Sequence, residues 1–458
     1  IGKDRHGLTG DTINLAKRLT NLAKPGEIIA GPNTYKIAKH RFSFKASDPV
    51  QVKGKQNLIQ PFKVDDTEAI RTTKLKGVRA DLIGRNKELI LFGEAVTDLK
   101  SGKGAVFCLY GAAGSGKSRL VEEFRTTTSV QWFEGYTYPY TKSTPYFPLI
   151  TLFNNAMGLQ EDDSPAALKE KIEKSIKNLI KNNKEVIPYI GTLYSLNYPE
   201  IENVSPEFFK DKLFDAVLSV IEALAKGEPT VICLEDLHWA DPSSLELIRF
   251  IHANIDVPLL FLYISRPVIQ IFSDSQIDKM KLEYQELKIS DLNSSDSKIM
   301  IKSLLDTDKI PNDLENFVEN KAQGNPFYLE EIINSLKESD VLVLNKNTWH
   351  LTRNITESDI SSSIHGVIAA RVDRLEEESR KIIQEASVIG RSFYYKIINH
   401  ITETRKDISL CLETLEGLDF IKSRQTKIDL EYIFKHALTQ EVVYNGLLKT
   451  QRRILHEK

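Results

Sequence analysis

The feature that most constrains the fold of this chain is a glycine-rich loop inside the stretch AVFCLYGAAGSGKSRLVEEF, residues 105–124. Gly111, Gly116, Lys117 and Ser118 satisfy the spacing G-x-x-x-x-G-K-[ST]. An apolar run typical of a buried strand precedes the loop, and an amphipathic helical pattern follows it. This context favours a strand–loop–helix unit of a parallel sheet over a glycine-rich turn that binds nothing.

This loop has the chemistry of a phosphate-binding site. Glycines let successive backbone N–H groups face one phosphate, and the helix that follows presents its positive dipole end to the same anion. We expect Lys117 to reach the outer phosphates and Ser118 to ligate magnesium, so ATP and Mg²⁺ are the predicted ligands. The candidate nucleotide-binding residues here are Gly111, Gly114, Ser115, Gly116, Lys117, Ser118 and Arg119.

A second stretch, PTVICLEDLHWADPSSLELIRFI at residues 229–251, supplies the acids that such a loop requires. The apolar run 231–234 predicts a buried strand that ends in Glu235 and Asp236, at the strand edge where parallel α/β sheets bind ligands. We expect Glu235 to hold magnesium and Asp236 to polarise the attacking water. His238 and Trp239 are expected to pack and to orient their neighbours, with a catalytic role as the alternative.

Composition restricts the partners and the cellular compartment that we expect for this chain. With 61 basic and 63 acidic residues the net charge is −2, so no excess of positive charge points to nucleic acid. The three cysteines, Cys108, Cys233 and Cys411, lie far apart, which fits a reducing compartment. No apolar run approaches the roughly 18 residues of a membrane helix. We therefore expect a cytoplasmic protein with no membrane partner, and the chain reads as a fragment of a longer one.

Changes in pattern along the chain suggest five segments. Residues 1–66 form the first and the polar stretch 67–80 is a linker. Alternating strand and helix patterns in residues 81–270 predict a parallel sheet with crossover helices. Residues 271–365 look mainly helical, and residues 366–458 combine helical patterns with two short strand-like runs, FIKSRQ and LEYIFKH. The predicted fold class is α/β with helical appendages.

The motifs LIGRNKEL, the phosphate loop, EDLHWADPSSLELI, LLFLYISRP and GNPFYLEEII, within residues 81–335, resemble those of signal-transduction ATPases with numerous domains, the STAND ATPases. The resemblance implies a P-loop ATPase core with a helical lid. It implies that Gly84 and Arg85 touch the nucleotide base and that Arg266 senses the terminal phosphate. It also implies that the lid reports on bound nucleotide through Gly324, Asn325, Pro326 and Phe327.

The tail extends the resemblance. ARVDRLEEESRKIIQEASVIGRSF (370–393) and residues 432–458 look like the winged-helix module that follows such ATPase cores in proteins where tetratricopeptide repeats come next. A winged helix can bind DNA through one helix. The candidate helix here, ALTQEVVYNGLL, has no basic face, so internal docking is favoured and a nucleic-acid partner is not expected.

The first segment has a resemblance of its own. Asn14 and Arg18 are i and i+4 neighbours on a helix expected from about Thr12. With LAKPGEIIAGPNTY after it, this helix resembles the C-terminal half of a class III adenylyl/guanylyl cyclase domain. In that family the asparagine orients the substrate ribose and the arginine stabilises phosphate charge, which the resemblance transfers to Asn14 and Arg18. The family's metal-binding aspartates belong to the other half of the domain, so cyclic AMP synthesis is expected only in the complete parent.

Together these patterns predict an ATP-binding, slowly hydrolysing regulatory module of a soluble adenylate cyclase-type protein. Its expected partners are the nucleotide, the other cyclase half or a second protomer, and helical repeats further along the parent. The alternative is a non-enzymatic ATP-binding scaffold or a transcriptional regulator that uses the winged helix.

Overall fold

The computed structural model describes residues 15–16, 19–20, 22–24, 27–32, 34–35, 43–50, 59–66, 82–160, 163–181, 183–345, 348–356, 359–402, 408–425 and 430–458. The chain divides into two compact units. The sheet unit holds residues 78–375 and 441–446, and the terminal unit holds residues 1–77, 376–440 and 447–458. Across the residues described, no helix has the length and apolar character needed to span a membrane.

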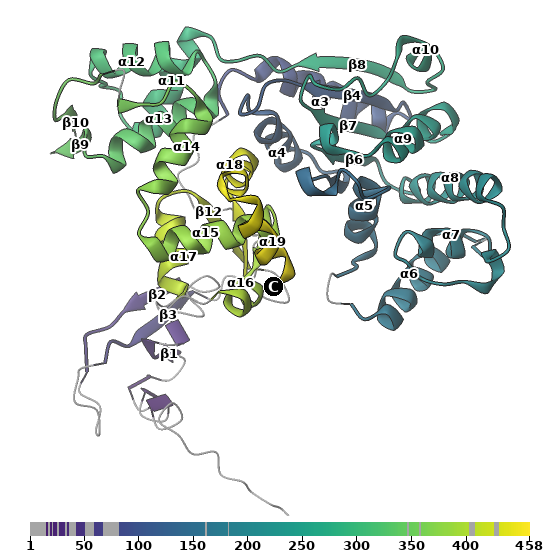
Figure 1. The fold of residues 1–458 in the computed structure, drawn as a ribbon, viewed down its shortest axis with the longest axis horizontal. Coiled ribbons are helices and arrows are strands. Elements are labelled where there is room, and N and C mark those ends of the chain that lie inside the picture. The colour runs from purple at the N-terminus through teal and green to yellow at the C-terminus, as the bar shows by residue number, and fades with distance from the viewer. Residues whose placement is uncertain are drawn as a thin grey trace, which may run out of the picture. The chain divides into compact units, whose positions relative to one another are not determined.

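A five-stranded, all-parallel sheet forms the centre of the sheet unit (Figure 1). The strand order is β5-β6-β7-β4-β8. The strands are β4 (Ala105–Tyr110), β5 (Gln131–Tyr136), β6 (Thr230–Glu235), β7 (Leu260–Ser265) and β8 (Glu283–Lys288). This arrangement confirms the predicted parallel α/β sheet of a P-loop NTPase.

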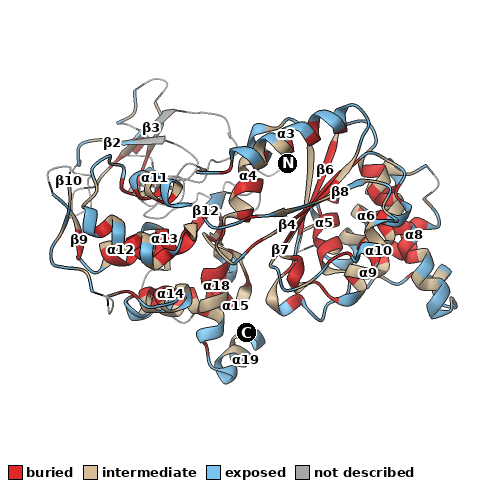
Figure 2. Cartoon of the chain, turned by 90° about the horizontal axis from the view of Figure 1, so that it is seen from above, coloured by how far each residue is buried: buried red, intermediate tan, exposed pale blue. Residues whose placement is uncertain are grey.

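Helices cover both faces of this sheet because its central strands are apolar on both sides. On one face Phe107 and Leu109 of β4 pack with α3 (Asn86–Lys100) and α4 (Lys117–Thr127). On the other face Val106 and Cys108 join a core shared with α5 (Phe147–Met157), α8 (Pro206–Leu224) and α9 (Pro242–Asn254). Figure 2 shows the buried central strands between these layers. Helices α6 (Pro165–Leu179) and α7 (Val186–Thr192) pack against α8.

A helical bundle with its own core follows the sheet in the chain. Its helices are α11 (Ser294–Leu305), α12 (Asn312–Ala322), α13 (Pro326–Glu338) and α14 (Ile364–Asp373). The antiparallel hairpin of β9 (Leu342–Asn345) and β10 (Thr348–Leu351) lies between α13 and α14 in sequence. The short helix α10 (Asp274–Ile277) precedes the bundle. The segment 271–365 is less helical than expected, since it also contains the edge strand β8 and the hairpin strands β9 and β10.

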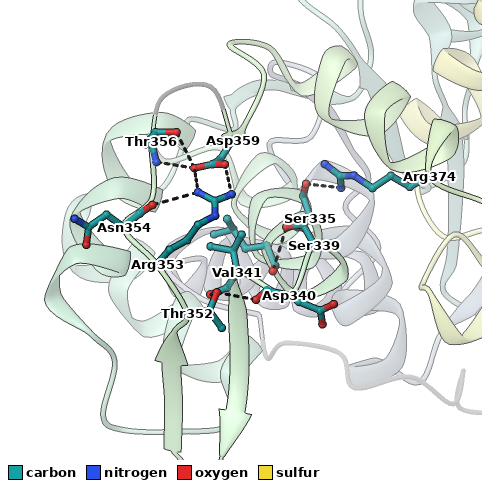
Figure 3. A network of polar contacts seen from close by, with 11 residues as sticks. Ser335, Ser339, Asp340, Val341, Thr352, Arg353, Asn354, Thr356, Asp359 and Arg374 are labelled. Atoms are coloured by element: carbon teal, nitrogen blue, oxygen red, sulfur yellow. Dashed lines mark hydrogen bonds and ion pairs between the residues drawn. The ribbon is translucent and has the colours of Figure 1, made fainter.

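Polar contacts hold the chain that leaves the hairpin (Figure 3). The Arg353 guanidinium binds both carboxylate oxygens of Asp359, at 2.9 and 2.5 Å, and the backbone N–H of Thr356 donates to the same carboxylate. These contacts hold the pKa of Asp359 well below its usual range. The Thr352 hydroxyl, just after β10, donates to the carbonyl of Asp340, which lies between the end of α13 and the start of β9. This bond holds the end of the hairpin next to its beginning.

The terminal unit contains two small antiparallel sheets. The first has the order β1-β3-β2, from β1 (Ile29–Ala30), β2 (Ser43–Ala46) and β3 (Phe62–Asp66). The second has the order β11-β13-β12, from β11 (Ser392–Tyr394), β12 (Ile421–Gln425) and β13 (Leu430–Phe434). The last two match the strand-like runs predicted there. The described helices of the terminal unit include α15 (Glu377–Ile389), α16 (Tyr395–Ile401), α17 (Ile408–Gly417) and α19 (Lys449–Glu457). Helix α18 (Ala437–Gly446) is shared between the units.

Candidate nucleotide site

The glycine-rich loop connects β4 to α4 and curls around the lysine side chain. Gly116 has φ +92°, a conformation that a side chain would strain, and it leads directly into α4 at Lys117. The Lys117 ammonium donates to the carbonyl oxygens of Gly111 and Ala112, at 2.9 and 2.8 Å. The hydroxyl of Ser115 is buried and makes no hydrogen bond with any residue the structure describes. The loop therefore offers a fixed cation and an unused donor at the start of a helix, as a phosphate requires.

The loop and the acidic strand meet at one contact. The hydroxyl of Ser118, in the first turn of α4, donates to the Glu235 carboxylate across 2.9 Å, and Glu235 ends β6. These are the two residues that sequence reasoning assigned to magnesium. A hydroxyl and a carboxylate are hard oxygen ligands of the kind Mg²⁺ prefers. The contact brings the two predicted metal ligands together from positions 117 residues apart.

Asp236 follows in a left-handed backbone conformation, with φ +58°. This turn ends β6 and starts the short 3₁₀ helix Leu237–Trp239. Thr137, just beyond β5, fixes the turn, because its N–H donates to the Glu235 carbonyl at 3.2 Å and its hydroxyl to the Asp236 carbonyl at 2.5 Å. The two acids thus stand at the carboxyl end of the sheet on a backbone held from the neighbouring strand. Sequence reasoning missed Thr137, which no motif marks.

Charges of both signs act on Lys117. Burial is the main cause that lowers the pKa of Lys117, to about 8, and the Arg266 cation lowers it further. The carboxylates of Asp236 and, to a smaller extent, Glu235 act in the opposite direction. The same four groups were predicted as catalytic residues. They therefore share one electrostatic environment, in which an anionic ligand would favour the charged lysine.

Arg266 follows β7 directly and its guanidinium is already engaged. One Nη donates to Glu441 Oε2 across 2.6 Å, and both residues belong to the sheet unit. The guanidinium carbon also lies 6.0 Å from the centre of the Trp239 ring. Glu441, in α18, was not predicted as a partner of this arginine.

The start of α13 touches the phosphate loop. The Asn325 side-chain amide donates to the Ala113 carbonyl at 2.9 Å, and the Phe327 N–H donates to the Gly114 carbonyl at 3.3 Å. A Cβ added at Gly114 would lie 2.7 Å from Asn325 Oδ1, so only glycine permits this approach. Asn325 also caps α13 through the N–H of Tyr328, and Pro326 occupies the first turn of the helix. Hydrogen bonds from Asn325 and Phe327 therefore connect the start of α13 directly to the phosphate loop.

The remaining candidates fall into different surroundings. Gly84 has φ +71° and packs against Asp296. Arg85 is buried, with its guanidinium donating to the Ser115 carbonyl of the phosphate loop at 3.2 Å. Arg119 pairs with Glu123 one turn further along α4, at 2.6 Å. Asn14 and Arg18, the candidates taken from the cyclase resemblance, lie outside the described residues.

Comparison with known proteins finds similarity over different parts of this chain. Residues 81–262 match the family model described as AAA ATPase domain. An uncharacterized protein of Rhizobium meliloti is 24% identical over 475 residues, covering 100% of this chain and 44% of its own length. Adenylate cyclase type 10 of Oryctolagus cuniculus is 23% identical over 277 residues, covering 57% of this chain and 16% of its own length. The chain thus spans less than half the length of these curated relatives.

Among solved structures, one similar chain is a Signal Transduction ATPase with Numerous Domains (STAND) protein with a tetratricopeptide repeat sensor from Pyrococcus horikoshii. It is 12% identical, with a TM-score of 0.47, and the match covers 84% of this chain and 45% of that one. The family match, the parallel sheet and the loop geometry agree with one another. Residues 81–262 thus match an AAA ATPase domain model, and the chain has a P-loop NTPase-like fold.

Proposed function

We propose that the sheet unit binds ATP with Mg²⁺ and hydrolyses it slowly, and that this turnover regulates a larger signalling protein. The observation that carries the proposal is the 2.9 Å contact between Ser118 and Glu235 beside the buried Lys117. It joins the phosphate loop to the acidic strand, and an ATPase needs both parts in one place.

The residues present fit the metal that the proposal requires. No group of three or more His, Cys, Asp or Glu side chains suited to a metal ion occurs among the described residues. Mg²⁺ commonly uses one or two protein oxygens, with water and nucleotide phosphates completing its shell. Ser118 and Glu235 would supply those protein ligands. The bound ion would neutralise charge on the outer phosphates.

Two side chains of the protein carry the remaining steps in this proposal. Lys117 binds the outer phosphates as a fixed cation, and Asp236 accepts a proton from the attacking water as its oxygen joins the terminal phosphorus. The bond to the bridging oxygen breaks, giving ADP and phosphate. Asp236 is suited to this role because its carboxylate is partly exposed, at 26%, so water can reach it.

We extend the proposal to the parent protein. The likeness to adenylate cyclase type 10 and the cyclase-like motif around Asn14 and Arg18 both favour a soluble adenylate cyclase-type protein. In this proposal the AAA ATPase domain controls cyclic AMP synthesis by the complete parent.

Phosphate release tests the enzymatic part of this proposal. Purified chain should release phosphate from ATP in the presence of Mg²⁺, and the release should stop when Mg²⁺ is chelated. Lys117→Ala serves as the matched inactive variant and excludes a contaminating ATPase. Equal release from the wild-type chain and from Lys117→Ala would contradict the proposal.

A further inference from the structure

A cavity of about 470 Å³ lies against the sheet on the face away from α3 and α4. In the sheet β4 runs between β7 and β8 (Figure 1). Tyr263 of β7, Cys108 of β4 and Glu286 of β8 stand opposite one another in the register of these strands, so their side chains share one face. They line the cavity, and no member of the predicted nucleotide site does. The volume lies within the range typical of small-molecule sites, about 300 to 1,000 Å³.

The cavity exists because little helix covers this part of the sheet. Residues 266–282 connect β7 to β8 past the intervening β4, and they contain only the four-residue helix α10. A parallel crossover usually covers its sheet with a longer helix. Here Ile271 and Phe272 pack into the core, and residues 267–270 before them form the roof of a hollow.

The roof is held from α9 and from the core. Arg249, in α9, donates through Nε to the Ile271 carbonyl at 2.8 Å and through one Nη to the Gln270 carbonyl at 3.5 Å. The ring of Phe272 meets the ring of Tyr284 edge-on, with 5.7 Å between their centres. These contacts fix the end of the roof, so the fold itself builds the cavity.

The cavity wall carries negative charge and aromatic rings. Glu286 is the one charged residue among the described residues that line it. Its Oε1 accepts a hydrogen bond from the Tyr284 hydroxyl at 2.7 Å, which fixes the carboxylate beside that ring. Burial raises the pKa of the Cys108 thiol to about 12, so the thiol adds no second charge. Tyr110 and Tyr263 also line the cavity. A carboxylate among aromatic rings, with no basic residue, attracts an organic cation and repels an anion such as a nucleotide.

We propose that this cavity binds a small organic ammonium ion that carries apolar groups on its nitrogen. The tyrosine rings and the apolar part of the roof contact those groups, and Glu286 balances the positive charge. Aromatic side chains recognise quaternary ammonium ions in this way, because the ring face attracts a cation that cannot donate a hydrogen bond. The proposal does not depend on the proposed function, since it requires no nucleotide in the phosphate loop.

Choline and 3,3-dimethyl-1-butanol are matched probes, because the alcohol has the shape of choline without its charge. In an NMR titration without nucleotide, the purified chain should bind choline about tenfold or more tightly than the alcohol. Glu286→Gln should lose most of this preference. Glu283→Gln is the matched control, since it removes the same charge from β8 at a residue that does not line the cavity, and it should bind choline as the wild type does.

Equal affinities of the wild-type chain for the two probes, or no binding of choline, would overturn the proposal. So would an equal loss of choline affinity in Glu286→Gln and Glu283→Gln, which would mark a general effect of surface charge. Wild-type chain labelled at its isoleucine methyl groups gives a measurement that does not depend on a charge variant's folding. The signal of Ile269, which lines the cavity, is assigned by its loss in Ile269→Val. It should shift with choline and not with an equal concentration of sodium chloride, and binding of choline that leaves this signal unshifted would place the ligand elsewhere and overturn the proposal.

Discussion

Arg266 and Glu441 form an ion pair of 2.6 Å, with side chains 23% and 13% exposed. The resemblance to STAND ATPases assigns Arg266 to the terminal phosphate of ATP. A guanidinium held by a carboxylate must share or leave that partner in order to bind a phosphate. If Arg266 binds the terminal phosphate as proposed, Glu441 would compete with the nucleotide for this arginine. The pair links the end of β7 to α18 within the sheet unit.

This competition predicts that Glu441→Gln increases the preference for ATP. Removal of the carboxylate charge should raise the affinity for a non-hydrolysable ATP analogue by roughly two- to fivefold, as expected for a partly exposed ion pair. Fluorescence titration with labelled nucleotides measures the change. Glu123→Gln, which removes the partner of Arg119 on α4, is the matched control and should leave the affinity unchanged. Weaker binding in Glu441→Gln would show that the pair supports the site.

If nucleotide state moves the bundle that Asn325 connects to the phosphate loop, protease sensitivity of residues 271–365 should differ between ADP and the ATP analogue. Arg266→Ala should erase the difference, because the arginine is the group expected to meet the terminal phosphate. Limited proteolysis followed by mass spectrometry locates the cuts. Identical digestion of the wild-type chain in both nucleotides would leave a static binding module without a switch.

Substitution of Glu235, which ends β6, and of Asp236, which follows it, should separate nucleotide binding from turnover. Asp236→Asn should retain ATP affinity and slow phosphate release by about a hundredfold or more, because a carboxamide cannot accept the proton of the attacking water. Glu235→Gln should instead raise the Mg²⁺ concentration needed for tight ATP binding, since it removes the charge of the proposed metal ligand. ATP and Mg²⁺ titrations measure binding by both variants, and a phosphate-release assay measures turnover by Asp236→Asn. Loss of ATP affinity in Asp236→Asn would show that Asp236 is structural or binds the metal.

A buried ion network should dominate the stability of the α13–α14 contact. The Arg371 side chain, 1% exposed, binds both carboxylate oxygens of Glu331, at 2.7 and 2.8 Å, and also contacts Glu338. Glu331→Gln leaves a buried guanidinium without its full charge partner and should cost about 3 kcal/mol of unfolding free energy. Urea unfolding measures it. Glu173→Gln, in the exposed pair with Lys177, should change stability by less than about 0.5 kcal/mol, and an equally small effect at Glu331 would contradict the account.

Stability should also fall as the pH decreases below neutrality. Burial lowers the pKa of His252 from 6.5 to about 3. Between these values the unfolded chain binds a proton that the folded chain does not, so the unfolding free energy decreases as the pH falls through this window. His252→Gln removes this titration and should flatten the decline measured by urea unfolding between pH 7 and 5. Some slope should remain, since His238 shifts in the same direction. An unchanged slope would show that His252 titrates normally in the folded protein.

The phosphate loop and the acidic strand could be predicted because each is encoded locally. Gly116, Lys117 and Ser118 occupy fixed positions in one short motif, and the apolar residues of β6 lead directly to Glu235. Parallel strands with loops at one edge then bring Ser118 and Glu235 together. The fold of the sheet unit follows from the same alternation of strands and helices.

The edge strand β8 was not predicted from the sequence, and the reason is physical. Its sequence EYQELK has no apolar run, because among the described strands it pairs with β4 alone and its residues are exposed or half-buried. The partners of Arg266 and Arg371 could not be predicted either. Glu441 lies 175 residues from Arg266 along the chain, and Glu331 lies 40 residues from Arg371, so only tertiary packing brings these charges together.

Titration of the purified chain with ATP in the presence of Mg²⁺ tests the central claim most directly. Isothermal titration calorimetry should give saturable binding, and Lys117→Ala should raise the dissociation constant by at least about tenfold, because it removes the buried cation of the phosphate loop. Lys103→Ala, whose side chain is 77% exposed, is the matched control and should bind as the wild type does. Equal dissociation constants for the wild-type chain and Lys117→Ala, or no binding by the wild-type chain, would contradict the claim that this loop holds ATP.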